Sequence, residues 1–210
     1  MTAVAAVDLP DGVNYDPTTI SGQQIRSATE YGGVRVHLLG FLGTARERIR
    51  IDVGFGDALP AGPVTIDFPT LLSDETPSLL AYSFQTVIAE KLQAATILFD
   101  VNSRYKDFYD IHALATREEF DATTLHCALE ATFQQRGMRV VDIGRLFSTA
   151  FTDDSKRQSQ WSAFRRRVDQ RAPERFSSLM NDLRRFLEPI LFEPSVRRWR
   201  PAAWSWEGEA

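Results

Sequence analysis

The sequence predicts an α+β fold in which a small antiparallel or mixed sheet, incomplete at its N-terminal side, precedes a helical C-terminal region. Two patterns predict this order. Apolar and polar residues alternate in three segments before residue 76, and apolar residues recur at helical spacing from residue 77 onward. We therefore expect a sheet region over 1–76 and a helical region over 77–210. Three strands are few for so much helix, which is why we expect the sheet to be incomplete.

The strands are expected at 34–38, 48–55 and 64–68, with turns at 40–43 and 56–63. In the second of them, RIRIDVGF, charged or small residues alternate with apolar ones, as in a half-buried strand. The spacing of the three segments favours an antiparallel meander with one face on a core. The first thirty residues show little periodicity, so no element is predicted there.

The first helical stripe runs from Phe84 to Phe99 and the second from Phe108 to Ala115. Pro173 and Pro189 are expected to separate or end the later helices. We predict these later helices at about 123–135, 141–151, 157–170 and 174–188. The C-terminal segment has no clear period, and its three tryptophans are expected to pack on the protein's own surface.

Composition limits the class of protein. The 210 residues are 43% hydrophobic and 25% charged, which excludes long disorder, collagen and coiled-coil architectures. No run of eighteen apolar residues occurs, so no membrane span is predicted. The first ten residues lack the basic start of a secretory signal, and the single cysteine, Cys127, permits no internal disulfide. We expect a cytoplasmic protein.

The net charge of −4 conceals a strong polarity. Residues 1–133 hold 9 Lys+Arg against 18 Asp+Glu, whereas residues 134–200 hold 15 against 8. Either a carboxylate site lies beside a surface that binds a polyanion such as RNA, or the two surfaces attract each other. The basic half has arginines near Trp161, Phe164 and Val168, the three side chains predicted to face the core. These arginines are Arg165, Arg166, Arg167, Arg171, Arg175, Arg184 and Arg185.

Lys91 is the most informative residue. At about 100° per residue, it falls between Leu98 and Ala95, in the middle of the apolar stripe of its helix. An ammonium group aimed at a core needs an anion or a water-filled cleft, because an unpaired buried charge is costly. Lys91 is therefore either a phosphate-binding lysine or the partner of a structural ion pair, or it reaches out to solvent along its stem.

Two aspartates could share a site with Lys91. Asp107 lies on the inward edge of the next helix, near a first turn that Asn102 or Ser103 could cap, while Asp110 points about 100° away from that edge. Asp52 projects from its strand opposite its apolar neighbours, as a carboxylate for metal-assisted phosphoryl transfer would if that face lines a cleft. The plainer alternatives are a solvated Asp52 and an Asp107 that only stabilises the helix dipole. We predict that Lys91, Asp107 and the Asp52 face converge on one concave site.

Several motifs, taken in order and spacing, are specific together. They are EYGGVRV (30–36), IDVGFGD (51–57), PTLL (69–72), AEKLQA (89–94) and NSRYKDFYD (102–110), followed more loosely by QWSAF (160–164) and FLEP (186–189). In these motifs the chain resembles the nucleotidyltransferase AbiEii/AbiGii toxin family over roughly residues 11–192.

The resemblance implies the toxin of a bacterial toxin–antitoxin or phage-defence system, with a nucleotidyltransferase fold and a cognate antitoxin. It implies transfer of a nucleotide from an NTP, with Mg²⁺, to an RNA acceptor such as tRNA. By the same resemblance Lys91 and Asp107 are catalytic. Arg104, Lys106 and Asp110 would bind the nucleotide or its phosphates, and Asp52 would bind metal by analogy with nucleotidyltransferases in general.

The sequence also departs from the family pattern. The family has a Gly-Ser or Gly-Gly-Thr stretch and an Asp-x-Asp strand before the region matched here, and this sequence contains no Asp-x-Asp. We therefore expect a truncated chain that is weakly active or inactive alone. Two alternatives stay open: the missing half comes from another polypeptide, or the chain is a non-enzymatic module that binds RNA or an antitoxin.

Overall fold

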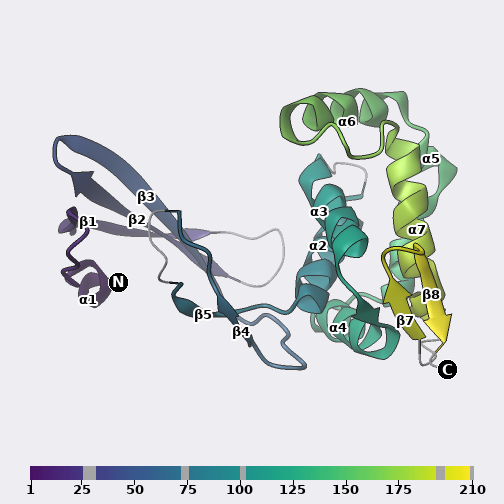
Figure 1. Ribbon diagram of the computed structural model, residues 1–210, viewed down its shortest axis with the longest axis horizontal. Coiled ribbons are helices and arrows are strands. Elements are labelled where there is room, and N and C mark those ends of the chain that lie inside the picture. The colour runs from purple at the N-terminus through teal and green to yellow at the C-terminus, as the bar shows by residue number, and fades with distance from the viewer. Residues whose placement is uncertain (26–31, 72–75, 100–102, 193–196, 209–210) are drawn as a thin grey trace. The chain divides into compact units, whose positions relative to one another are not determined.

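The protein has an α+β fold with small antiparallel sheets and a set of helices, as predicted (Figure 1). The computed structural model describes residues 1–25, 32–71, 76–99, 103–192 and 197–208. The chain divides into two compact units, Met1–Asp57 and Ala58–Ala210. The hairpin near residues 64–81 groups with the second unit, whereas the sequence pattern placed most of it with the sheet region.

The first unit is a three-stranded antiparallel sheet in the order β1-β2-β3, with a short helix before it. Leu42 pairs with Ala45 across a two-residue turn, and Gly43 there has a φ of 58°, the left-handed conformation that such hairpins need. Val36 and Leu38 are buried on one face of the sheet. Its elements are α1 (Thr2–Ala5), β1 (Val13–Ile25), β2 (Gly33–Leu42) and β3 (Ala45–Gly54).

Strand β1 was not predicted. It pairs with β2 along its length, but the register shifts between Asp16 and Ser21. Pro17 lies within that irregularity, where a residue without an N–H group costs no ladder hydrogen bond. Pro17 and Gly22 interrupt the alternation in the sequence, and this is why the strand was missed.

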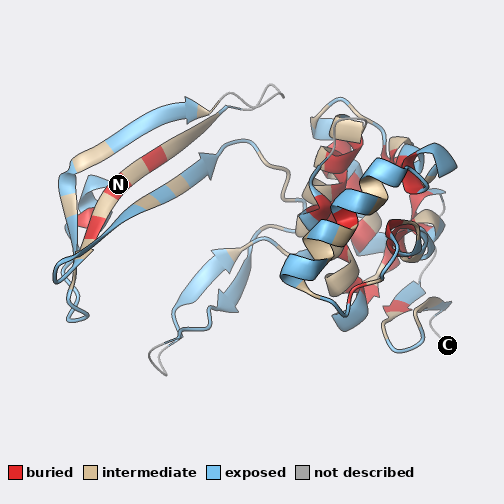
Figure 2. Cartoon of the chain, turned by 90° about the horizontal axis from the view of Figure 1, so that it is seen from above, coloured by how far each residue is buried: buried red, intermediate tan, exposed pale blue. Residues whose placement is uncertain are grey.

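The predicted third strand is a strand, but its place in a meander was wrong. β4 (Val64–Asp67) pairs with β5 (Ser78–Ala81) and forms a separate two-stranded hairpin. The segment 78–81, expected to be helical, is therefore extended. Figure 2 shows this hairpin largely exposed, whereas buried residues concentrate in the helical part.

The second unit contains helices within a few residues of most of the predicted bounds, but the single helix predicted at 141–151 is a 3-10 helix followed by a separate short α-helix. Several begin at side chains that accept a hydrogen bond from the first turn: Ser83 from the Thr86 N–H and Asp121 from the Thr124 N–H. Among the described residues, none of the helices combines the length and hydropathy that crossing a membrane requires. The elements are α2 (Phe84–Leu98), α3 (Tyr105–Arg117), β6 (Phe120–Asp121), α4 (Ala122–Gln135), the 3-10 helix η2 (Val140–Phe147), α5 (Thr149–Thr152), α6 (Ser155–Val168), α7 (Phe176–Phe192), β7 (Arg197–Arg200) and β8 (Ser205–Gly208).

Helix α7 contacts α3, α4, α6 and η2 and lies at the centre of this core. Pro189 lies inside α7, so the prediction that it ends the helix was wrong. The residues that follow it, Ile190 and Leu191, are buried, and the Ile190 carbonyl is hydrogen-bonded to His126 Nδ1 at 2.7 Å. Their burial outweighs the hydrogen bond that a proline removes from a helix.

The tryptophans of the C-terminal segment pack on the protein itself, as expected. β7 pairs with both β6 and β8, and Trp199 contacts the rings of Phe186, Trp204 and Trp206. In α6, Trp161 is fully buried and Phe164 packs against the core. Val168 is 48% exposed, which contradicts its predicted core position; it is the last residue of α6.

Candidate functional site

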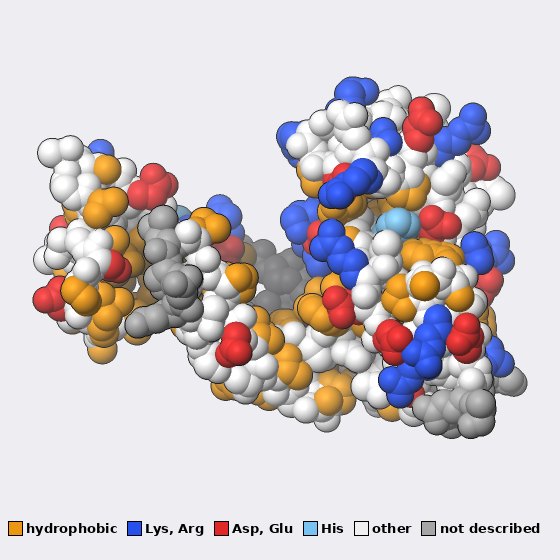
Figure 3. Space-filling model, in the orientation of Figure 1, with side chains coloured by type: hydrophobic (Ala, Val, Ile, Leu, Met, Phe, Trp, Pro, Cys, Tyr) orange, Lys and Arg blue, Asp and Glu red, His pale blue; other side chains and the backbone are white. Residues whose placement is uncertain are grey.

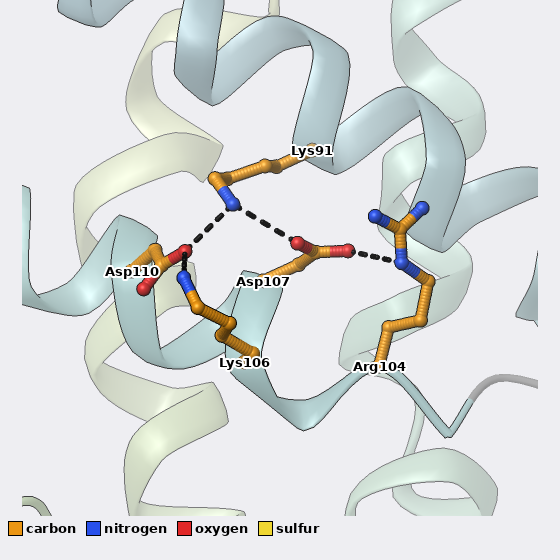
Figure 4. A network of polar contacts seen from close by, with 5 residues as sticks. All are labelled: Lys91, Arg104, Lys106, Asp107 and Asp110. Carbon is orange, nitrogen blue, oxygen red and sulfur yellow. Dashed lines mark hydrogen bonds and ion pairs between the residues drawn. The ribbon is translucent and has the colours of Figure 1, made fainter. Parts of the chain in front are cut away.

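Lys91 and Asp107 come together across the contact between α2 and α3, as predicted (Figure 4). The Lys91 ammonium donates to Asp107 Oδ1 at 3.0 Å and to Asp110 Oδ2 at 2.7 Å. The lysine side chain is 21% exposed, and that of Asp107 is 4% exposed. The apolar stripe of α2 therefore carries a cation that two carboxylates of the next helix satisfy.

Asp107 lies in the first turn of α3, and its second oxygen faces another cation. Arg104 Nε lies 2.8 Å from Asp107 Oδ2, a contact between charges that lacks the geometry of a hydrogen bond. Arg104 occupies the N-cap position without a side-chain capping bond, so the expected cap by Ser103 was wrong. Asn102, the other expected cap, lies outside the described residues, as do 30–31 and Leu72 of the motifs named above.

Asp110 is a full member of the cluster, which corrects its lower ranking on angular grounds. Its Oδ2 accepts from Lys91 and also from Lys106 at 2.6 Å, one turn earlier on α3. The Lys91 side chain extends from α2 and is long enough to reach both Asp107 and Asp110 on α3. An angle measured on one helix alone underestimates that reach.

The cluster of Lys91, Arg104, Lys106, Asp107 and Asp110 carries three cations against two carboxylates, a net charge of +1. Burial alone would lower the pKa of Lys91, but the hydrogen bonds to Asp110 and Asp107 outweigh it and raise the pKa above its ordinary value. Lys91 is therefore an ammonium ion at neutral pH and cannot act as a base. The outer cations are the exposed ones, Lys106 at 70% and Arg104 at 54%.

Asp52 is placed by β3 in the first unit and faces away from Ile51 and Val53, as the alternation predicted. Arg35, its partner in the register of β2, donates to both of its oxygens, at 2.7 and 2.8 Å. This hydrogen-bonded pair lowers the pKa of Asp52 below its ordinary value, so the carboxylate is ionised at neutral pH. Its convergence with Lys91 and Asp107 stays a prediction.

The carboxylates described here do not fit a divalent metal ion well. The described residues contain no group of three or more His, Cys, Asp or Glu placed to hold one. Asp107 faces Lys91 and Arg104, Asp110 faces two lysines, and Asp52 is bound by Arg35. These cations would repel a metal and would attract an anion. The five-residue cluster is therefore suited to phosphate groups, and we derive no step through a metal.

The arginines of the basic half divide into two groups. Arg165 donates to the carbonyls of Gln170 and Ala172, so it holds the loop after α6. Arg166 and Arg167 are exposed, and Figure 3 shows Lys and Arg side chains gathered over α6. Arg166 and Arg167 are therefore available to a partner, whereas Arg165 is engaged with its own chain.

A family model described as "Nucleotidyl transferase AbiEii toxin, Type IV TA system" matches residues 1–194 of the chain. No curated protein and no solved structure matches the chain significantly. The match covers the sheet of the first unit and the cluster of α2 and α3.

Proposed function

Because the chain belongs to the AbiEii family of nucleotidyl transferase toxins from type IV toxin–antitoxin systems, we propose that it takes part in transferring a nucleotide from an NTP to an RNA acceptor such as tRNA. In this reaction an acceptor hydroxyl oxygen bonds to the α-phosphorus. The bond from that phosphorus to the α–β bridging oxygen breaks, pyrophosphate leaves with the electron pair, and the hydroxyl proton passes to solvent. The family also implies a cognate antitoxin as partner.

The observation that carries the proposal is the cationic cluster between α2 and α3. Phosphoryl transfer depends mainly on positioning the phosphates and neutralising their charge. Lys91 is held by Asp107 and Asp110 as a fixed ammonium ion, and fixed charges need no reorganisation when a phosphate binds. We propose that Lys91 binds the triphosphate and that Asp107 orients Lys91 for it.

The exposed cations would complete the phosphate site. Arg104 and Lys106 contact Asp107 and Asp110 at spacings of three and four residues. The Arg104 and Lys106 side chains are 54% and 70% exposed, so each can exchange its carboxylate for a triphosphate while the buried Asp107 stays paired with Lys91. Asp110 would keep Lys91 in place during that exchange.

The test is NTP binding by the purified chain, followed with a fluorescent ATP analogue. The double variant Arg104→Ala/Lys106→Ala is expected to bind roughly tenfold or more weakly, because two charge-assisted contacts to phosphate are lost. Arg117→Ala/Arg175→Ala is the matched control: it removes two exposed cations from the same unit and should change affinity less than about twofold. Absence of saturable NTP binding by the unaltered chain would contradict the proposal.

Transfer itself is a separate measurement. The sequence has no Asp-x-Asp pair, so we expect the purified chain alone to give no robust labelling of bulk tRNA from labelled NTPs. Clear labelling that disappears in Lys91→Ala would show instead that the residues present suffice for catalysis. RNA binding without NTP binding would favour the second candidate function, a non-enzymatic RNA-binding module, which the exposed arginines of α6 support.

A further inference from the structure

Strand β3 carries a row of arginines on one face of the three-stranded sheet. Arg46, Arg48 and Arg50 are exposed and alternate with residues of the opposite face. Side chains two residues apart on an antiparallel strand are separated by about 6.8 Å. We call these three residues the arginine track. Their spacing is close to that of successive phosphates along an extended single strand of nucleic acid.

The register of β2 places flat or apolar side chains beside the track. Arg46 pairs with Phe41, Arg48 with Leu39, and Arg50 with His37. Cationic side chains interleaved with aromatic rings on an open sheet are what single-stranded nucleic acids need, because the cations follow the backbone while the rings stack on bases.

The track has little local neutralisation. Within the part of the chain that the structure describes, no carboxylate lies within 4.0 Å of an Arg46, Arg48 or Arg50 nitrogen. The acid next along the same face, Asp52, is held by Arg35. These five residues alone therefore carry a net charge of +3.

One further acid lies on this face. Asp16, on β1 opposite Leu39, accepts hydrogen bonds from the backbone and the hydroxyl of Thr18. Its carboxylate is therefore already engaged two strands away from β3. With Asp16 included, the face keeps a net charge of +2.

The pKa of His37 reflects its burial and the positive charge of the neighbouring arginines. Burial lowers its pKa, and the positive charges of Arg48, Arg35 and Arg50 lower that pKa further. Its Nδ1 atom is out of contact with solvent and has no hydrogen-bond partner among the described residues. A pocket of about 570 Å³ lies beside the track, and its lining includes His37, Leu39, Arg46 and Arg48 together with one carboxylate, Glu47. The His37 side chain lines this pocket, so a base that enters it would lie against the imidazole ring.

We propose that the arginine track binds the phosphate backbone of a single-stranded RNA, with bases beside Phe41 and His37. The inference rests on the proposed function, since this RNA is the acceptor of the transferred nucleotide. A double helix fits the observations less well, because its bases are stacked inside and cannot reach the pocket or the rings.

The test measures binding of a fluorescein-labelled single-stranded RNA of about 12 nucleotides, within the site sizes typical of single-strand surfaces. For single strands the logarithm of affinity falls with the logarithm of salt concentration by about 0.7 per phosphate contact. The variant Arg46→Gln/Arg48→Gln/Arg50→Gln is expected to lower that slope by about 2 and to weaken low-salt binding roughly tenfold or more. The corresponding triple Lys variant, checked with the Gln variant by circular dichroism, should retain most of the slope.

The matched control removes three exposed arginines from the other unit and outside α6, in Arg117→Gln/Arg139→Gln/Arg197→Gln, and should leave RNA affinity within about twofold. Lost binding in this control with retained binding in the track variant would overturn the inference. So would unaltered RNA binding in the track variant, or a polyglutamate peptide that binds the track as tightly as RNA does. NTP binding should be equal in all these proteins, so a failure of the track and a failure of the nucleotide site are distinguishable.

Discussion

Replacement of Lys91 by Met is expected to lower the free energy of unfolding of the second unit by about 3 kcal/mol. Removing one partner of a buried ion pair typically costs about 3–5 kcal/mol, because the other charge is left without compensation. The lower end applies here, since Asp107 keeps its contact with Arg104 and Asp110 keeps Lys106. Urea unfolding followed by tryptophan fluorescence measures this unit alone, because all four tryptophans lie in Ala58–Ala210.

A second variant separates the structural role of Lys91 from its role in binding phosphate. Lys91→Met/Asp107→Leu removes both charges, so we expect it to recover roughly 2 kcal/mol of what the single changes lose together. We also expect it to bind the ATP analogue as poorly as Lys91→Met does. ATP binding at the level of the unaltered chain would make Lys91 a structural residue only and would contradict the proposed function.

The same pair gives a pH dependence whose sign follows from the raised pKa of Lys91. The stabilisation is fully present below the ordinary lysine pKa of 10.5 and is lost as pH rises through the raised value. The difference in stability between the unaltered chain and Lys91→Met is therefore expected to be constant around neutral pH. It should shrink in strongly alkaline solution, where the unaltered chain loses its ammonium ion.

The sequence predicted those features of the site that depend on the periodicity of a single helix. Lys91 interrupts the apolar stripe of α2, and a charge in that place requires a partner, which the structure supplies in Asp107. Asp110 was ranked too low because its distance from Lys91 depends on how α3 packs against α2. That packing is a tertiary property, and the period of either helix does not contain it.

The three arginines of the track can be read from the sequence, but a charge sum over residues 1–133 conceals them. Arg46, Arg48 and Arg50 alternate within a segment recognised as a strand, yet residues 1–133 sum to a strongly acidic total. A phosphate responds to charges within about a Debye length, so the face of one strand matters more than the sum over half the chain. What the sequence did not contain was the register that sets His37 and Phe41 beside those arginines.

Replacement of Trp199 by Ala is expected to lower the free energy of unfolding of the second unit by about 3–5 kcal/mol, the usual cost of deleting a large buried aromatic side chain. Trp199 is 1% exposed and contacts the rings of Phe186 and Trp206. Its Nε1 donates to the Ala115 carbonyl at 2.7 Å, so it joins the C-terminal hairpin to the end of α3. Urea unfolding followed by circular dichroism, with the remaining tryptophans as a second probe, measures the loss.

Two further variants separate the contribution of the indole hydrogen bond to this free energy from that of the buried ring. Trp199→Phe keeps an aromatic ring and removes the indole N–H, so the buried Ala115 carbonyl loses its partner at a cost of about 1–3 kcal/mol. Phe192→Ala removes an aromatic side chain that is 68% exposed, and it should change stability by less than about 0.5 kcal/mol. Equal losses in Trp199→Ala and Phe192→Ala would contradict the burial argument. At low temperature Trp199→Ala should still bind the ATP analogue normally, because Asp107 lies in the first turn of α3 and Ala115 near its last.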